Sequence, residues 1–449
     1  MSKSKFKLNE SNEIFYYENE THSLYDNNGI VLSLPSLEDE HFYLEESKKH
    51  GVLHKDTTPI ALRILLGHAC NFDCGYCMQK DIGNPNERPE NFLLDPFIDS
   101  IDKNLDLSEL IRVELWGGEP FLYWRDMVKI MSFLDREGLE FYISTNGSPL
   151  VQKHVDFFKT LKARVSITIS HDGPGQEALR GEDVLKNDKK IEILKQLHAM
   201  KDKVGVSYNT VISNTNYDLF EINDYFKDYA MSTGIGSDVR LYFIAGKNYN
   251  DTDIDGVSSE HILHGETLSH FNTIFKRYLD IYLKDLGKDV DDRRLLKNGI
   301  VEGSSGLINY AVKLRNSIPI TTRSNCGADS SDVLSMDIQG RVRVCPHTHE
   351  KFVSGYVDNI EAVKIVGLDV ERKTSHCYHC PVKRMCKSSC PIKFPDKVFL
   401  SNCAIEKVWY GNLQKAAFKL FFKENVEFLE ENVEITNENK SVQDIFAQV

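Results

Sequence analysis

The sequence lacks any long apolar run and any excess of positive charge. No segment approaches the roughly 20 apolar residues that a membrane-spanning helix needs. The N-terminus, MSKSKFKLNESNEIFYY, has no apolar core of a signal peptide. These absences predict a cytoplasmic protein without a membrane partner. Because 67 acidic residues against 54 basic ones give a formal net charge of -13, the surface should repel phosphate backbones, and no nucleic-acid partner is expected.

Low-complexity linkers and internal repeats are also missing. Hydrophobic residues form 41% of the chain and charged residues 27%, a balance that excludes global disorder and supplies packed cores. The length of 449 residues exceeds that of one average domain, so two or three domains are expected.

Cysteine is missing from a long central stretch of the chain, between Cys77 and Cys326. Three cysteines precede this stretch, and the other seven of the ten follow it. In a reducing cytoplasm, thiols serve metal binding or catalysis more often than disulfides. The distribution therefore predicts two separate cysteine sites on two domains.

Short β-rich runs alternate with helical patterns such as DMVKIMSFLDREG over the first half of the chain. The expected strands are 61–67, 112–118, 140–146, 163–170, 205–212 and 239–246. Six β/α repeats predict an α/β fold with a parallel sheet, wound into an open barrel or left as an open sheet. The loops that follow the strands then share one face, where chemistry gathers.

The first cysteine group is Cys70, Cys74 and Cys77, directly after the first expected strand. A structural zinc ion takes four protein ligands, and here only His68 could be the fourth. A four-iron, four-sulfur cluster held by three thiolates keeps one iron open for a cofactor. The alternatives are a zinc knuckle or buried free cysteines.

This Cys-x3-Cys-x2-Cys spacing, with Tyr76 before the last cysteine, resembles the radical S-adenosylmethionine (SAM) superfamily. The resemblance implies a partial (β/α)6 barrel whose cluster binds the amino and carboxylate groups of SAM. One electron from the cluster would cleave SAM to a 5′-deoxyadenosyl radical that abstracts hydrogen. Cys70, Cys74 and Cys77 are then both the catalytic and the metal-binding residues.

Further matches stand at the ends of the following strands. By resemblance Gly118 and Glu119 of Trp-Gly-Gly-Glu-Pro contact the SAM amino group, although such a sequence is also an ordinary strand-to-helix turn. Ser144 and Asn146 occupy the next strand end, where Asn-Gly is a common turn in its own right.

The later strand ends offer contacts for the rest of SAM. Ser170 and Arg180 match a Ser-x-Asp-Gly-Pro…Arg-Gly pattern, which by resemblance binds the SAM ribose and carboxylate. A guanidinium suits a carboxylate because it offers two parallel donors. Tyr76, through its backbone, and Val211 are expected near adenine. Asp172 is expected to have a structural role at most.

The second cysteine group resembles the SPASM domain, a C-terminal extension of peptide-modifying radical SAM enzymes. The order runs Cys326-x13-Gly340-x4-Cys345, then Cys-x2-Cys-x5-Cys-x3-Cys, then a last cysteine. The resemblance implies two auxiliary 4Fe-4S clusters, three clusters in all. One would be held by Cys377, Cys380, Cys386 and Cys403, and the other by Cys326, Cys345 and Cys390. A binuclear zinc module is the alternative.

The cluster of Cys326, Cys345 and Cys390 has only three thiolates. Asp329, His347 or His349 could be the fourth ligand, or the site could stay open for a substrate thiolate, which would suit thioether formation. The sequence leaves this choice undecided.

The family divides by substrate into sulfatase maturases, modifiers of ribosomal precursor peptides, and builders of redox cofactors from peptides. Sulfatase maturases usually show an Asp after the cysteine of the Gly-x4-Cys element, where this chain has Pro346. The prediction is therefore a maturase that crosslinks a precursor peptide through a thioether or carbon–carbon bond. The alternative is oxidation of a protein Cys or Ser to formylglycine. The implied electron donor is a flavodoxin or ferredoxin.

The expected organisation has five parts. They are a β-rich segment at 1–58 that includes a hairpin and is a candidate for part of a peptide-recognition module, the radical SAM barrel at 59–246, a helical bridge at 247–322, the SPASM domain at 323–410, and an acidic helix or tail at 411–449. Two other classes remain open: a zinc scaffold that binds proteins, and a radical SAM enzyme acting on a small molecule.

Overall fold

The structure is a computed structural model of the 449-residue chain. It describes residues 3–8, 10–18, 23–28, 31–33, 53–77, 79, 94–236, 238–243, 261–286, 326–348, 350–366, 368, 376–377, 380–387, 390–392, 396–422 and 426–431. Every structural statement below concerns these residues.

A nine-stranded sheet organises the chain, in the order β11-β10-β9-β8-β7-β6-β12-β13-β14. The six strands expected from sequence are all present and mutually parallel, in chain order. They are β6 (Ala61–Leu65), β7 (Arg112–Trp116), β8 (Glu140–Thr145), β9 (Arg164–Ser170), β10 (Val204–Ile212) and β11 (Val239–Phe243). This confirms the prediction of a parallel α/β sheet.

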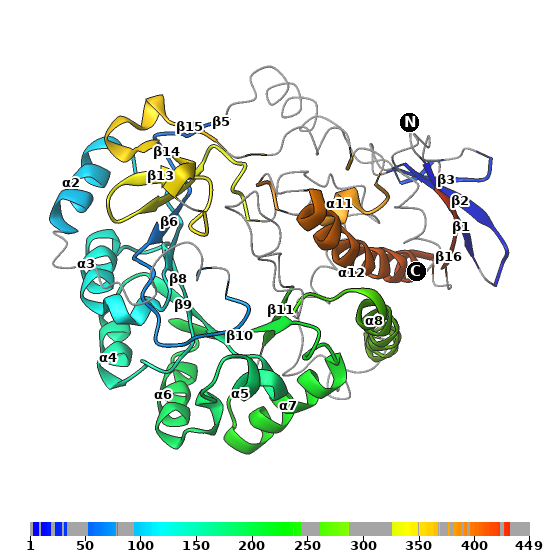
Figure 1. Cartoon of the computed structure of the whole chain (residues 1–449), viewed down its shortest axis with the longest axis horizontal. Coiled ribbons are helices and arrows are strands. Elements are labelled where there is room, and N and C mark those ends of the chain that lie inside the picture. Colours follow the sequence, from blue (N-terminus) through cyan, green and yellow to red (C-terminus); the bar gives the residue numbers. More distant parts are fainter. Residues whose placement is uncertain are drawn as a thin grey trace.

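Helices cover one face of this sheet. Figure 1 shows them in an arc outside the strands. They are α2 (Leu94–Asn104), α3 (Trp124–Leu134), α4 (Gln152–Thr160), α6 (Asp188–Ala199) and α7 (Leu219–Thr233), with the short α5 (Gln176–Leu179) after β9. Side chains alternate accordingly. In β8, Phe141 and Ile143 are buried, whereas Tyr142 and Ser144 on the opposite, concave face are half-exposed.

The sheet continues into the cysteine-rich part of the chain. β12 (Val333–Asp337) pairs in parallel with β6, which makes a seventh parallel strand that the sequence did not predict. β13 (Arg341–Arg343) and β14 (Val353–Tyr356) follow in antiparallel order. The buried Lys55, just before β6, donates hydrogen bonds to the carbonyls of Ser330 (2.5 Å) and Val333 (2.7 Å). These contacts connect the second cysteine region to the segment that precedes β6.

A second sheet joins the two ends of the chain, in the order β16-β1-β2-β3-β4. Its strands are β1 (Lys3–Leu8), β2 (Ile14–Glu18), β3 (Ser23–Asp26), β4 (Val31–Ser33) and β16 (Val426–Glu431). The expected hairpin is present as β3 and β4, which pair antiparallel. The acidic tail was expected to be a helix or a frayed end, and this is wrong for residues 426–431, which form strand β16. β16 pairs with β1, because β1 otherwise leaves one edge of this sheet unpaired.

A 27-residue helix, α12 (Asp396–Phe422), precedes β16 and carries Cys403, which sequence analysis had not placed on a helix. It packs against α8 (Gly265–Leu286), the helix expected in the bridging segment. Shorter helical elements are α11 (Lys383–Cys386), η1 (Pro120–Tyr123), η2 (Gly173–Gly175), η3 (Val184–Lys186), η6 (Glu350–Phe352) and η7 (Val357–Ala362), and β5 (Leu53–His54) pairs with β15 (Lys364–Ile365). The parts of the bridge at 247–260 and 287–322, and the tail from 432, lie outside the described residues. Within the described residues, no helix has the length and apolarity to cross a membrane.

The sheet of β1–β4 and β16 packs on α12 through aromatic side chains, among them Phe418. Phe418 is fully buried, and its ring lies 4.9 Å from Phe6, 5.7 Å from Phe15 and 5.5 Å from Tyr17. We expect Phe418→Ala to lower the free energy of unfolding by about 3–5 kcal/mol, because it removes buried surface and creates a cavity. Urea denaturation followed by circular dichroism measures this change.

The matched control is Leu400→Ala on the same helix, whose side chain is 42% exposed. It should change the free energy of unfolding by no more than about 0.5 kcal/mol. Equal losses in the two variants would contradict this packing role for Phe418.

Candidate functional site

The first three cysteines lie on the loop that follows β6. Cys74 is buried, whereas Cys70 and Cys77 are half-buried. Burial raises the pKa of Cys70, and it raises that of Cys74 to about 11. The neighbouring thiols add to both shifts, and Arg180 opposes the shift of Cys74. A bound metal centre would reverse this balance because it stabilises thiolates.

The turn after β7 packs directly on the start of this cysteine loop. Gly118 donates a backbone hydrogen bond to the Gly67 carbonyl (2.9 Å), and Glu119 donates one to the Ala69 carbonyl (2.8 Å). A Cβ atom on Gly118 would collide with the carbonyl oxygens of His68 and Ala69 and lie 2.7 Å from the Ala69 carbonyl carbon. Glycine is therefore required at this position for the two backbones to approach so closely.

The Glu119 carboxylate joins the ends of β7 and β8. It is fully buried and accepts hydrogen bonds from the Asn146 N–H (2.8 Å), the Thr145 hydroxyl (2.8 Å) and the Phe121 N–H (3.0 Å). Burial raises its pKa to about 7, and these hydrogen bonds oppose the rise. Glu119 thus stands where the sequence predicted and also has a structural role that the sequence did not reveal.

The end of β8 also contacts the cysteine loop. Asn146 Nδ2 donates to Asn71 Oδ1 (2.9 Å), and Asn71 donates to the Ser148 hydroxyl (2.6 Å). Ser144 lies half-buried on β8, in register with Thr168 of β9. The two expected SAM contacts therefore differ: Asn146 touches the loop directly, whereas Ser144 lies deeper in the sheet.

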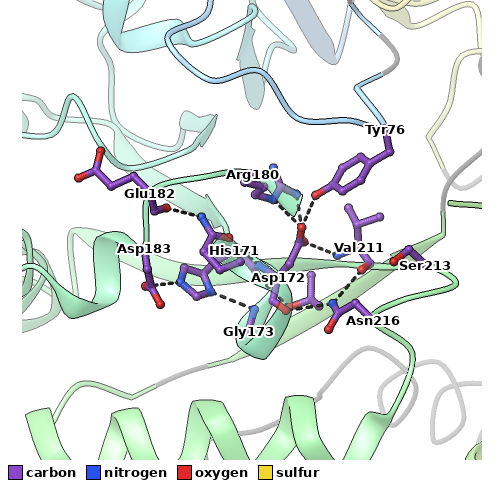
Figure 2. A network of polar contacts seen from close by, with 12 residues as sticks. Tyr76, His171, Asp172, Gly173, Arg180, Glu182, Asp183, Val211, Ser213 and Asn216 are labelled. Atoms are coloured by element: carbon purple, nitrogen blue, oxygen red, sulfur yellow. Dashed lines mark hydrogen bonds and ion pairs between the residues drawn. The ribbon is translucent and has the colours of Figure 1, made fainter. Parts of the chain in front are cut away.

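The end of β9 contacts the cysteine loop through a buried carboxylate, shown in Figure 2. Asp172 accepts hydrogen bonds from Tyr76 Oη, from Arg180 Nε (2.9 Å) and Nη2 (3.2 Å), and from the Val211 N–H (2.9 Å). The Arg180 guanidinium also lies 5.3 Å from the centre of the Tyr76 ring. Sequence analysis gave Asp172 at most a structural role, although its place directly after β9 and eight residues before Arg180 was a usable signal.

The other expected SAM contacts surround this network. Ser170 ends β9 in register with Asn209 of β10. Burial raises the pKa of Tyr76, and the Asp172 carboxylate adds to the rise, so the phenol stays protonated as a donor.

Gly75 packs so closely on His261 that a Cβ atom would lie 2.9 Å from His261 Nε2. The sequence gave no means of finding this neighbour of the cysteine loop.

Five of the seven later cysteines line one pocket, together with Lys383 and Lys407. They are Cys377, Cys380, Cys386, Cys390 and Cys403. Burial raises the pKa of Cys380 to about 12 and that of Cys403 to about 11. The pocket brings together the four thiols expected to share one cluster, and Cys390, expected at the other, lies beside them.

Cys326 and Cys345 do not line this pocket, and both interact with Arg63. Arg63 Nη2 donates to the Cys326 carbonyl, and its Nε donates to Glu114 (2.9 Å). Burial raises the pKa of Cys345 to about 12; the Cys326 thiol adds to the rise and Arg63 opposes it. A buried guanidinium beside two thiols would stabilise their anionic form.

The candidates for a fourth ligand beside Cys326, Cys345 and Cys390 differ in position. The His347 N–H donates to Cys345 Sγ (3.5 Å), and the His347 ring lies 3.3 Å from Gln79 Nε2 and packs edge-on against Trp116. Burial lowers the pKa of His347 to about 4. Asp329 is buried in the turn after Cys326, whereas His349 lies outside the described residues.

All ten cysteines have free thiols. Among the described residues, no three His, Cys, Asp or Glu side chains converge closely enough to share one metal ion. In a four-iron cluster each thiolate binds a different iron. Three thiols on one loop and five around one pocket are donor sets of the kind that such clusters use.

Comparison with known proteins identifies the class. Residues 64–222 match the family model of the Radical SAM superfamily. The radical SAM cyclopropyl synthase TigE of Paramaledivibacter caminithermalis is 24% identical over 391 residues, 80% of this chain and 72% of TigE. The GTP 3′,8-cyclase of Clostridium perfringens is 25% identical over 303 residues, 64% of this chain and 80% of the cyclase.

A solved structure shares the overall fold. Native anSMEcpe with bound AdoMet and Cp18Cys peptide is 15% identical, with a TM-score of 0.54 over 81% of this chain and 99% of that chain. The chain thus carries a radical SAM domain. It is an enzyme that uses radical chemistry, with the α/β fold of anSMEcpe.

The close approach at Gly118 gives a test of how the cysteine loop is held. We expect Gly118→Ala to displace residues 68–69, because its Cβ has no room against their carbonyls, and so to impair cluster assembly on Cys70, Cys74 and Cys77. The iron content of the variant after anaerobic reconstitution should be lower than that of the wild type by the iron of one cluster.

Gly205→Ala in β10 is the control, since its Cβ would meet only the Ser166 hydroxyl at an ordinary 3.5 Å. This variant should keep the full iron content. Full iron content in Gly118→Ala as well would refute the role of the close contact.

Proposed function

We propose that this enzyme binds SAM at a [4Fe–4S] cluster on Cys70, Cys74 and Cys77 and abstracts a hydrogen from a ribosomally made precursor peptide to install a thioether or carbon–carbon crosslink. One observation carries the proposal: the three-thiol loop lies against the ends of three successive parallel strands, at Gly118, Asn146 and Asp172. The cluster and SAM, when bound, would supply the one-electron chemistry.

The chain's own residues would bind and orient SAM. Gly118 and Glu119 are assigned to its amino group, Ser170 to its ribose and Arg180 to its carboxylate. Ser144, Asn146, Val211 and the Tyr76 backbone complete the assignment. Because Glu119 already accepts three hydrogen bonds, its remaining lone pair would be the acceptor for an ammonium.

The later cysteines are assigned to a SPASM domain at 323–410 with two auxiliary 4Fe-4S clusters. The pocket of Cys377, Cys380, Cys386 and Cys403 supports the first. The pair Cys326 and Cys345 beside Arg63 supports the second. Cys390 is assigned as its third ligand from the order of the cysteines alone, because Cys390 itself lines the pocket of the first four. A flavodoxin or ferredoxin would be the electron donor.

Two relatives support the proposal, one for the peptide substrate and the other for carbon–carbon bond formation. The peptide in the anSMEcpe structure occupies a protein of the same fold. TigE is named a cyclopropyl synthase, and closing a cyclopropyl ring requires a carbon–carbon bond. The anSMEcpe likeness also supports the alternative, oxidation of a protein Cys or Ser to formylglycine, but Pro346 stands where that branch usually has an Asp.

Removing the first three thiols tests the SAM site. Reconstituted wild-type enzyme should contain roughly twelve irons and release 5′-deoxyadenosine when SAM and dithionite are added. The Cys70→Ala, Cys74→Ala, Cys77→Ala variant should keep roughly eight irons and lose SAM cleavage, because the auxiliary sites lie on other elements. Cleavage that persists in the variant, or zinc in place of iron, would sink the proposal.

Replacing Cys345 separates the auxiliary site from SAM cleavage. Cys345→Ala should still form 5′-deoxyadenosine, because Cys345 is not one of the three thiols assigned to the SAM-binding cluster. It should lose most product, because the variant removes a ligand of an auxiliary cluster. Mass spectrometry of the peptide follows the loss of two hydrogen atoms expected for a crosslink. A hydrazide probe detects the aldehyde of formylglycine and so distinguishes the alternative. Full crosslinking by Cys345→Ala would show that this site is dispensable.

A further inference from the structure

The contacts of Asp172 exceed what a local turn requires. Its carboxylate is fully buried, yet it accepts hydrogen bonds from the cysteine loop, from Arg180 directly after α5, and from β10. Its own turn is already stabilised without that carboxylate. The Asp172 carbonyl accepts from Asn216 Nδ2 (2.9 Å), and its N–H donates to Gln176 Oε1 (3.0 Å). The side chain therefore holds in place the groups that it contacts and is not needed to stabilise its own backbone turn.

Arg180 is the most constrained of those groups. It uses Nε and Nη2, one edge of the guanidinium, for Asp172. The Tyr76 ring packs against the guanidinium at 5.3 Å. Among the described residues, Nη1 has no hydrogen-bond partner. Because a guanidinium is planar, fixing one edge also fixes the direction of the edge formed by Nη1 and Nη2.

The position of Arg180 places that edge beside the cysteine loop. Tyr76, under the guanidinium, lies between Cys74 and Cys77 in the chain, and Arg180 interacts electrostatically with Cys74. Figure 2 shows Tyr76 reaching from the cysteine loop to the Asp172 carboxylate, with Arg180 beside it. A carboxylate bound near these cysteines would therefore meet a preoriented two-donor edge.

We propose that Asp172 is a positioning residue, which holds Arg180 so that its second edge receives the carboxylate of SAM. This rests on the proposed function, since it assumes that SAM binds at the cysteine loop. Without Asp172, Arg180 would keep its charge but lose its fixed direction, and SAM would have to order it on binding.

Two variants test the role, with a third as control. Asp172→Asn keeps the side-chain shape but removes the charge that orients Arg180. Arg180→Lys keeps a cation for Asp172 but removes the planar fork. The control is Asp183→Asn, a buried carboxylate that accepts from His171 (2.8 Å), Tyr225 (2.8 Å) and the Leu185 N–H (3.0 Å) and makes no contact with Arg180 among the described residues.

Equilibrium dialysis of reconstituted enzyme measures the dissociation constants of SAM and of decarboxylated SAM, which lacks the carboxylate. Wild type should prefer SAM. Asp172→Asn and Arg180→Lys should each weaken SAM binding roughly tenfold or more. Both should bind decarboxylated SAM nearly as wild type does, so that the preference shrinks. Asp183→Asn should lower the thermal midpoint yet keep the wild-type preference.

Wild-type preference for SAM in either Asp172→Asn or Arg180→Lys would overturn the proposal and leave Asp172 a stabilising group only. If Asp172→Asn does not fold, Arg180→Lys decides by the same measurement. A wild-type enzyme that fails to bind SAM at all would instead sink the proposed function, which keeps the two failures distinct.

Discussion

A short loop of thiols, without helix or strand of its own, must be held in place by whatever surrounds it. In this protein the surroundings are the carboxyl ends of parallel strands, which lie along one edge of the sheet. The Gly118 contact, the Asn146 hydrogen bond and the Asp172 carboxylate each fix a different part of residues 66–77. The rest of the site depends on this attachment, because the relative positions of the three thiols change if the loop detaches from any one strand end.

Charge is balanced within this attachment. The Asp172 carboxylate compensates the Arg180 cation, and the Tyr76 phenol donates to the same carboxylate. Burial alone would lower the pKa of Arg180, but the Asp172 carboxylate holds it above its usual value, so the guanidinium stays charged. A buried, hydrogen-bonded ion pair of this kind fixes the orientation of its two side chains more than it increases the stability of the fold. Such a fixed orientation suits the proposed binding site of a charged ligand.

The two cysteine regions, separated by nearly 250 residues of sequence, are joined by the same sheet. β12 extends the sheet beside β6, and Lys55, before β6, and Arg63, on β6, reach to the backbone around Cys326. Gln79, just after the first cysteine loop, lies beside His347 of the second region. The strand pairing thereby brings the second cysteine region next to the loop of Cys70, Cys74 and Cys77.

The alternation of β-rich and helical segments determined all six parallel strands, because buried strands and amphipathic helices leave their periods in the sequence. Cysteine spacing likewise marked both thiol groups, since ligands of one centre recur at short intervals. Tertiary structure alone decided the pairing of β12 with β6 and of β16 with β1, the contact of His261 with Gly75, and the partners of Asp172 and Glu119. These pairs are distant in sequence, or their members look like ordinary turn residues, and their meeting depends on how the strands are ordered in space.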